Sequence, residues 1–333
     1  MVCQEELVLI EKVCELYDQI SSLESLKPCK DVNMLFTQLV HTCMPAPPNP
    51  NFDVSNLSKS VQETRSKLIR LCGEAEGLLE SHFSTLLSSY ENPLHHLNLF
   101  PYYSNYLKLS QLEFTILGQH LTTTNNTINK IAFVGSGPLP LTSIVLATKH
   151  FTKTAFHNYD IDPSANSQAL NLISPDPDMS RRMFFHTVDI MNVSNELKDY
   201  EVVFLAALVG MDKEEKVKVI DHLANYMSPG ALLMVRSAHG ARAFLYPVVD
   251  PCDLRGFEVL SIYHPTDEVI NSVVIARKLY PIMPIHSSVV LDHHNNKILL
   301  PSKCSEIQAF NPLNHAGNMI EEVLTIEDHH QLS

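Results

Sequence analysis

Two short motifs in the middle of the chain combine residue types that bind nucleoside cofactors. An apolar run over 131–134 leads into Gly135-Ser136-Gly137-Pro138, and the second motif is Tyr159-Asp160-Ile161-Asp162. Glycine tolerates a positive φ and lets a ligand approach the backbone, while an acidic residue at the end of the next strand can bind two ribose hydroxyls. The interval between the motifs leaves room for a crossover helix between parallel strands. The predicted cofactor-binding residues are Gly135, Ser136, Gly137, Pro138, Asp160 and Asp162.

Pro140 occupies the place of the third glycine in a dinucleotide-binding fingerprint. That glycine allows close packing of helix on sheet beneath a pyrophosphate, so its loss argues against NAD and FAD. The turn also lacks the Gly-Lys-Ser/Thr sequence of a phosphate-binding loop, which argues against ATP. S-adenosylmethionine carries no phosphate, and a helix that begins near Thr142 can bind its carboxylate through free backbone amides. We therefore expect S-adenosylmethionine as the ligand and no further cofactor.

The composition is that of a globular protein with two domains. The 333 residues exceed what one hydrophobic core usually holds, and 45% of them are hydrophobic while 18% are charged. No stretch is long and apolar enough to span a bilayer. The formal net charge of −13 argues against nucleic acid as a partner, because phosphate binding requires a basic face.

The cysteines indicate the compartment. The seven cysteines are scattered, without a Cys-x-x-Cys pair, and so indicate reduced thiols rather than disulfides or a zinc site. The amino-terminus begins Met1-Val2-Cys3 and lacks the basic start of a signal peptide. These features predict a cytoplasmic protein, and the sequence leaves open whether it forms a homo-oligomer.

The hydrophobic pattern changes near residue 125. Before it, apolar residues at helical spacing predict helices over 7–23, 32–40, 60–86 and 105–121. The third of these is expected to begin with a capping box at Ser60-Val61-Gln62-Glu63. After it, strands alternate with helices such as 213–226, and the expected strands are 130–135, 155–160, 183–188, 201–206 and 231–236. Two further extended runs, 257–264 and 270–277, form an expected antiparallel hairpin. The pattern predicts an all-α domain before an α/β domain with a methyltransferase-type Rossmann fold, a mostly parallel sheet closed by an antiparallel hairpin.

These elements divide the chain into three parts. Residues 1–125 form an expected helical domain that covers the active site, and residues 126–280 form the expected S-adenosylmethionine-binding domain. Residues 281–333 form an expected extension with a β-hairpin at His293-His294 and a flexible tail. Asp189 follows the third strand and is expected at the adenine edge of the ligand; a solvated loop residue is the equally open alternative.

The chain resembles the plant nicotianamine synthases over nearly its whole length. The matching segments are 90–94, Phe100-Pro101-Tyr102-Tyr103-Ser104-Asn105-Tyr106, 134–143, 159–162 and 235–240. Gly-Ser-Gly-Pro-Leu-Pro together with Phe-Pro-Tyr-Tyr is far more specific than a generic cofactor motif. The resemblance implies a transferase that condenses three molecules of S-adenosylmethionine into nicotianamine, a chelator of iron, copper and zinc, and releases three of 5′-methylthioadenosine.

The resemblance and the chemistry together suggest the catalytic residues. Transfer of the aminocarboxypropyl arm needs an α-amine that has lost a proton, so the site requires alignment and one base. Glu91 is the predicted base, because the aromatic residues that follow it would raise its pKa by desolvation; without the resemblance, an exposed helix-end carboxylate is the better interpretation. Tyr103 and Tyr106 are predicted to orient the base, and Tyr102 and Arg236 to bind substrate, with tyrosine packing and a surface salt bridge as the open alternatives.

The sequence contains three pairs of adjacent histidines that could suggest a metal site. The adjacent histidines at 95–96, 293–294 and 329–330 do not share a face, so we predict no metal site. An amine nucleophile and a thioether leaving group also need no Lewis acid. Two other functions stay open on the same fold, a small-molecule methyltransferase and a non-catalytic adenosine-ligand sensor. Product identity separates them, because methyl transfer releases S-adenosylhomocysteine and a sensor releases nothing.

Overall fold

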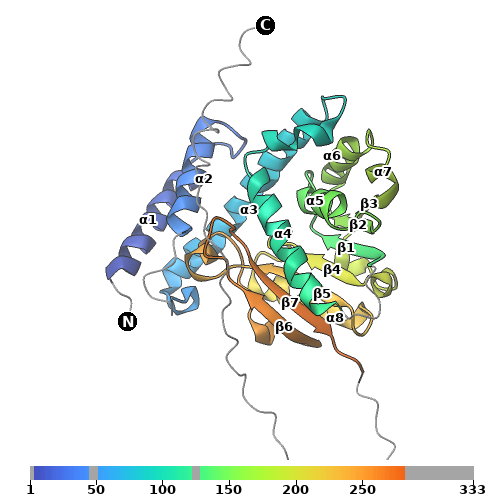
Figure 1. The fold of residues 1–333 in the computed structure, drawn as a ribbon. Coiled ribbons are helices and arrows are strands. Elements are labelled where there is room, and N and C mark those ends of the chain that lie inside the picture. Colours follow the sequence, from blue (N-terminus) through green and yellow to red (C-terminus); the bar gives the residue numbers. More distant parts are fainter. Residues whose placement is uncertain (1–3, 45–51, 122–127, 282–333) are drawn as a thin grey trace, which may run out of the picture.

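The computed structural model describes residues 4–44, 52–121 and 128–281 (Figure 1). The first part is helical and consists of α1 (Gln4–Ser21), α2 (Lys30–Cys43), η1 (Val54–Asn56), α3 (Lys59–Leu87), η2 (Pro93–Leu99) and α4 (Tyr103–His120). The strands of the second part are β1 (Lys130–Val134), β2 (Ala155–Asp160), β3 (Met183–Thr187), β4 (Val202–Leu205), β5 (Leu232–Ser237), β6 (Phe257–Tyr263) and β7 (Ser272–Lys278). Its helices are α5 (Leu141–Lys149), α6 (Pro163–Ile173), α7 (Met179–Arg182), η3 (Ile190–Asn192), η4 (Glu196–Asp199), α8 (Lys213–Tyr226), η5 (Gly240–Phe244) and η6 (Pro251–Asp253).

The strands form one seven-stranded sheet in the order β3-β2-β1-β4-β5-β7-β6. The first five are parallel, and β7 pairs antiparallel with both β5 and β6. This arrangement confirms the predicted methyltransferase-type Rossmann fold. The strand order reverses between β1 and β4, and ligands of open α/β sheets bind at the carboxyl ends of strands beside such a reversal.

Alternation along the strands builds two hydrophobic clusters, one on each face of the sheet. In β1, Ile131 and Phe133 belong to the cluster that includes α5 and α6, whereas Ala132 and Val134 belong to the cluster with α8. The cluster on the α5 side also contains Phe100 and residues of α4. The helical part therefore shares a core with the sheet instead of only touching it.

Helix α3 lies across the carboxyl ends of the parallel strands. Arg65 Nε donates to the Ala243 carbonyl after β5 at 2.6 Å, and Gly73 faces Met211 after β4. Further along, Glu80 lies over Gly137 after β1, and Ser81 accepts a hydrogen bond from Gln168 of α6 at 2.9 Å. Four contacts in the order of the strands thus fix the direction of α3, and Figure 1 shows it beside the sheet.

The start of α3 differs from the prediction. The capping box expected at Ser60 is wrong, because the helix begins two residues earlier and the side chain of Ser58 accepts the hydrogen bond from the Val61 amide. Ser60 is already inside the first turn. The predicted hairpin at 293–294 lies outside the described residues. None of the helices in the described ranges is long and apolar enough to cross a membrane.

Lys216 is a buried cation beneath the loop that follows β4. Its side chain is 2% exposed, and Nζ donates to the carbonyls of Ala206 at 2.9 Å and Ala207 at 2.8 Å. Burial lowers the pKa of Lys216 to about 7, because neither carbonyl carries a full negative charge. The folded protein therefore binds fewer protons at this site than the unfolded chain between that pKa and the ordinary lysine value.

We predict that Lys216 makes stability depend on pH. The unfolding free energy of the wild type minus that of Lys216→Met should rise with pH by about 1 kcal/mol per unit between about pH 7.5 and about pH 9. The rise follows because the unfolded chain keeps a proton that the folded protein has released. Urea unfolding curves of both proteins measure the difference, in which other titrating groups cancel. A difference that stays constant over this range would show that Lys216 remains charged in the folded protein.

Candidate active site

The structure brings the two predicted cofactor motifs together. Gly135 and Gly137 have φ of 80° and 66°, and the Gly135 amide donates to the Tyr159 carbonyl at 2.8 Å. The Gly137 amide donates to Asp160 Oδ2 at 2.9 Å, so the carboxylate at the end of β2 holds the glycine turn after β1. A Cβ at Gly135 would overlap the side chain of Val209, and one at Gly137 would lie 2.6 Å from Glu80 Oε2. Only glycine fits both positions.

The other predicted cofactor residues have varied surroundings. Asp162 caps α6 by accepting the Ser164 amide at 2.8 Å, and Asp189 caps η3 by accepting the Met191 amide at 2.9 Å. Both are exposed, so their contact with a ligand stays a prediction. Ser136 is 7% exposed, and its hydroxyl has no hydrogen-bond partner among the described residues. Pro138 is buried beside it.

Two glutamates of α3 that the sequence did not single out are Glu80, which faces the glycine turn, and Glu76, one helical turn before it. Glu80 is 8% exposed and accepts a hydrogen bond from Tyr106 Oη at 3.2 Å. Burial raises the pKa of Glu80 well above its usual range, and the charge of Glu76 adds to the shift. Glu76 accepts a hydrogen bond from Tyr246 Oη at 3.0 Å, and burial raises its pKa as well. The predicted Tyr106 therefore lies in the site, beside a carboxyl that the prediction did not name.

A signal for these glutamates is present in the sequence. Glu76 and Glu80 are four residues apart, so they lie on one side of the helix. Cys72 and Phe83 on that side are buried. Carboxylates in the apolar stripe of a long helix are rarely buried without a partner. That placement could have selected them over Glu91.

Arg236 is the buried cation of the site. It is 6% exposed, and its Nε and Nη2 donate to the two carboxylate oxygens of Glu113 at 2.7 and 3.0 Å. Nη2 also donates to Thr142 Oγ1 at 2.6 Å, and the guanidinium carbon lies 5.9 Å from the centre of the Tyr106 ring. The open alternative of a surface salt bridge is wrong, because the pair is buried. Substrate binding by Arg236 stays a prediction.

Glu91 does not have the buried position that was expected of it. Helix α3 ends at Leu87, and Glu91 is exposed in the connection to η2. The neighbouring ring of Tyr90 stacks on His96, with the two ring centres 4.1 Å apart. The desolvation on which its selection as the base depended is therefore absent.

The remaining tyrosines of the predicted site lie at the start of α4. Burial raises the pKa of Tyr102, the charge of Glu76 adds to the shift, and a hydrogen bond with Thr37 of α2 opposes it. Burial also raises the pKa of Tyr103. Both rings pack against the hydrophobic cluster shared with the sheet. Tyr102 is thus near the carboxyls, whereas no described contact joins Tyr103 to them.

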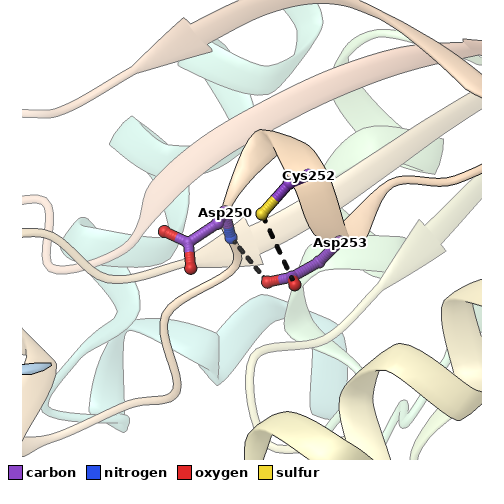
Figure 2. A group of neighbouring side chains, drawn as sticks. All are labelled: Asp250, Cys252 and Asp253. Atoms are coloured by element: carbon purple, nitrogen blue, oxygen red, sulfur yellow. Dashed lines mark hydrogen bonds between the residues drawn. The ribbon is translucent and has the colours of Figure 1, made fainter.

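One group of potential metal ligands has another explanation. Asp250, Cys252 and Asp253 lie together at η6 (Figure 2). Asp253 Oδ2 accepts the Asp250 amide at 3.0 Å, and Lys213 Nζ lies 2.8 Å from Asp250 and 3.3 Å from Asp253. The carboxylates are thus paired with a lysine and with the start of a short helix. We assign no metal to them.

Comparison with known proteins defines the class of this chain. The fold is that of a methyltransferase-type Rossmann domain preceded by a helical part. The chain belongs to the nicotianamine synthase family, because the model of the family described as "Nicotianamine synthase protein" matches residues 3–283. This finding confirms the resemblance inferred from the sequence.

Individual relatives agree over nearly the full length. A nicotianamine synthase of Solanum lycopersicum is 67% identical, with 97% of this chain and 98% of the relative covered. Nicotianamine synthase 3 of Arabidopsis thaliana is 62% identical, with 93% of this chain and 94% of the relative covered. The solved structure of MtNAS in complex with MTA and tNA has a TM-score of 0.66 and 20% identity, and 84% of this chain and 100% of that one are covered. It shares the fold.

We predict that Gly137→Ala weakens binding of S-adenosylmethionine at least about tenfold while the protein stays folded. The new Cβ would push against the Glu80 carboxylate, and the positive φ costs about 1–2 kcal/mol for a residue with a side chain. Gly77→Ala is the matched control, because it lies on α3 with open space around its Cβ position. Calorimetry and circular dichroism of both variants provide the measurement. Unchanged affinity in Gly137→Ala would remove the ligand from this turn.

Proposed function

We propose that this chain acts as a nicotianamine synthase with Glu80 as the base. The reaction condenses three molecules of S-adenosylmethionine by aminocarboxypropyl transfer and releases three of 5′-methylthioadenosine. The observation that supports the assignment of Glu80 is its position, a buried carboxyl directly over the glycine turn and hydrogen-bonded to Tyr106. A base in that place is next to the end of the ligand that must react.

The chemistry of one transfer assigns a task to each group. The acceptor ammonium gives a proton to Glu80, and the freed nitrogen lone pair attacks the arm carbon bound to sulfur. The carbon–sulfur bond breaks, and its electron pair neutralises the sulfonium to a thioether. Burial raises the pKa of Glu80, which makes the ionised group a stronger base than an exposed glutamate. Tyr106 orients the carboxylate, and we assign Asp160, which holds the glycine turn, to the ribose hydroxyls.

The positive charge of the ligand fits the site. Glu76, Glu80 and Asp160 supply carboxyls, whereas the buried guanidinium of Arg236 is bound to Glu113. A sulfonium and an ammonium therefore enter a region with an excess of acidic groups. Methyl transfer on the same fold is the alternative, and release of S-adenosylhomocysteine instead of 5′-methylthioadenosine would favour it.

The proposal extends to the whole chain. Residues 1–125 act as the domain that covers the ligand, and residues 126–280 bind it. The protein works in the cytoplasm without nucleic acid, and association with further copies of the chain stays open. The net charge of −13 supports the exclusion of nucleic acid.

We predict that Glu80→Gln lowers the release of 5′-methylthioadenosine about 10²–10⁴-fold near pH 7, because an amide cannot accept the ammonium proton. The rate should recover in part as the pH rises toward the pKa of the acceptor amine, because more of the amine is then already unprotonated. Glu91→Gln is the matched control on an exposed glutamate and should keep wild-type turnover. Mass analysis of the product over a pH series measures both. The assignment fails if Glu80→Gln turns over like the wild type, or if Glu91→Gln loses activity instead.

We also predict that removal of divalent metal leaves the initial rate unchanged. The leaving group is a neutral thioether and the nucleophile an amine, so no oxygen needs a Lewis acid. The measurement is the rate before and after dialysis against EDTA. A rate that falls in EDTA and returns with added zinc would contradict the prediction, whereas a fall that zinc does not reverse would indicate damage by the treatment.

A further inference from the structure

Glu76 is a second carboxyl beside the proposed base, and it has its own hydroxyl partner. It precedes Glu80 by one helical turn, so both side chains leave α3 on the same side. Tyr246 donates to Glu76 at 3.0 Å, while Tyr106 donates to Glu80 at 3.2 Å. Glu80 is 8% exposed, whereas Glu76 is partly exposed.

The electrostatics around Glu76 favour a cation. Burial raises the pKa of Glu76, and only the hydrogen bond from Tyr246, the charge of Arg236 and the hydroxyl of Tyr106 oppose this rise. Arg236 is bidentate to Glu113, so it cannot also form a contact pair of that kind with Glu76. A partly buried carboxylate in this condition is stabilised most by a positive group of a ligand.

The transfer reaction supplies such a group. The acceptor nitrogen loses its proton and attacks, but the arm that moves carries an α-ammonium of its own, which keeps its proton throughout. Glu80 cannot serve both nitrogens, because a carboxylate that has accepted one proton is neutral. A second carboxylate is therefore required if the arm is to be held by charge during the attack.

We propose that Glu76, oriented by Tyr246, binds the α-ammonium of the arm that is transferred. This role rests on the proposed function, because it assumes S-adenosylmethionine as the ligand. It divides the two glutamates of α3 between distinct tasks, with Glu80 as the proton acceptor and Glu76 as the group that orients the electrophile. Tyr246 is then a positioning residue, since it acts through Glu76.

Three ligands separate the charges that Glu76 could recognise. 5′-Methylthioadenosine has neither charged group, S-adenosylhomocysteine has the α-ammonium without the sulfonium, and S-adenosylmethionine has both. We expect Glu76→Gln to weaken the binding of S-adenosylhomocysteine about 10–100-fold, because a hydrogen bond to a charged group is lost. Binding of 5′-methylthioadenosine should stay unchanged, which also shows that the variant is folded. The affinity for S-adenosylmethionine should fall by the same factor. It is measured in a Glu80→Gln background, so that the ligand is not consumed.

Two further variants complete the calorimetric test. Tyr246→Phe should weaken the binding of S-adenosylhomocysteine by a smaller factor and leave the affinity for 5′-methylthioadenosine unchanged. Glu74→Gln is the matched control, an exposed carboxylate of the same helix, and should change no affinity. If Glu76→Gln does not fold, the split between the two ligands in Tyr246→Phe decides the question.

The outcomes distinguish the two proposals. Unchanged affinity for S-adenosylhomocysteine in Glu76→Gln would overturn the role of Glu76 alone, and weakening confined to S-adenosylmethionine would assign Glu76 to the sulfonium instead. Equal weakening of all three ligands would indicate a structural role and would also overturn it. Failure of the unaltered protein to bind 5′-methylthioadenosine would contradict the proposed function itself.

Discussion

Helix α3 has to lie across the carboxyl ends of the parallel strands, since contacts with the loops after β5, β4 and β1 and with α6 fix its path. This path determines the chemistry of the site. A Rossmann sheet alone offers the glycine turn and the acidic end of β2, which are enough to bind a nucleoside. The helix adds Glu80 over that turn and Glu76 one helical turn before it, the latter hydrogen-bonded to Tyr246. The candidate site therefore combines groups from the helical part and from the sheet.

Burial of several carboxyls around one guanidinium has an energetic cost, and the fold contains features that offset it. The bidentate pair of Arg236 and Glu113 satisfies the most buried charges. The hydroxyls of Tyr106 and Tyr246 stabilise the ionised forms of Glu80 and Glu76, yet burial still raises the pKa of both. Burial is the largest cause of both rises, and the charge of Arg236, which is bound to Glu113, opposes them without cancelling them. Perturbed carboxyls in contact with a ligand-binding turn are characteristic of functional sites.

The elements with strong local signals could be predicted from the sequence, and the site only in part. Strand 155–160 and helix 213–226 have the predicted bounds, and the Asp212 cap defines the start of the helix locally. The glycine turn and Asp160 are adjacent, as parallel strands require. The sequence favours Glu91 because it lies within a recognisable segment, whereas Glu80 belongs to no motif. The position of Glu80 depends on which loops α3 crosses, and that information lies in contacts between residues far apart in the chain.

The movement of charge during transfer explains why acidic groups belong on α3. Before the attack the sulfonium and the acceptor ammonium are both positive; afterwards the sulfur is neutral, the new secondary ammonium is positive and Glu80 holds a proton. Positive charge thus moves from sulfur to nitrogen. A carboxylate close to sulfur would stabilise the substrate more than the transition state and would slow the reaction, whereas a carboxylate close to the acceptor nitrogen removes the proton that blocks its lone pair. Glu80 must then release its proton before the next transfer. Its raised pKa favours uptake of the proton over release, so the same burial that makes Glu80 a strong base opposes the return of the base to its ionised form.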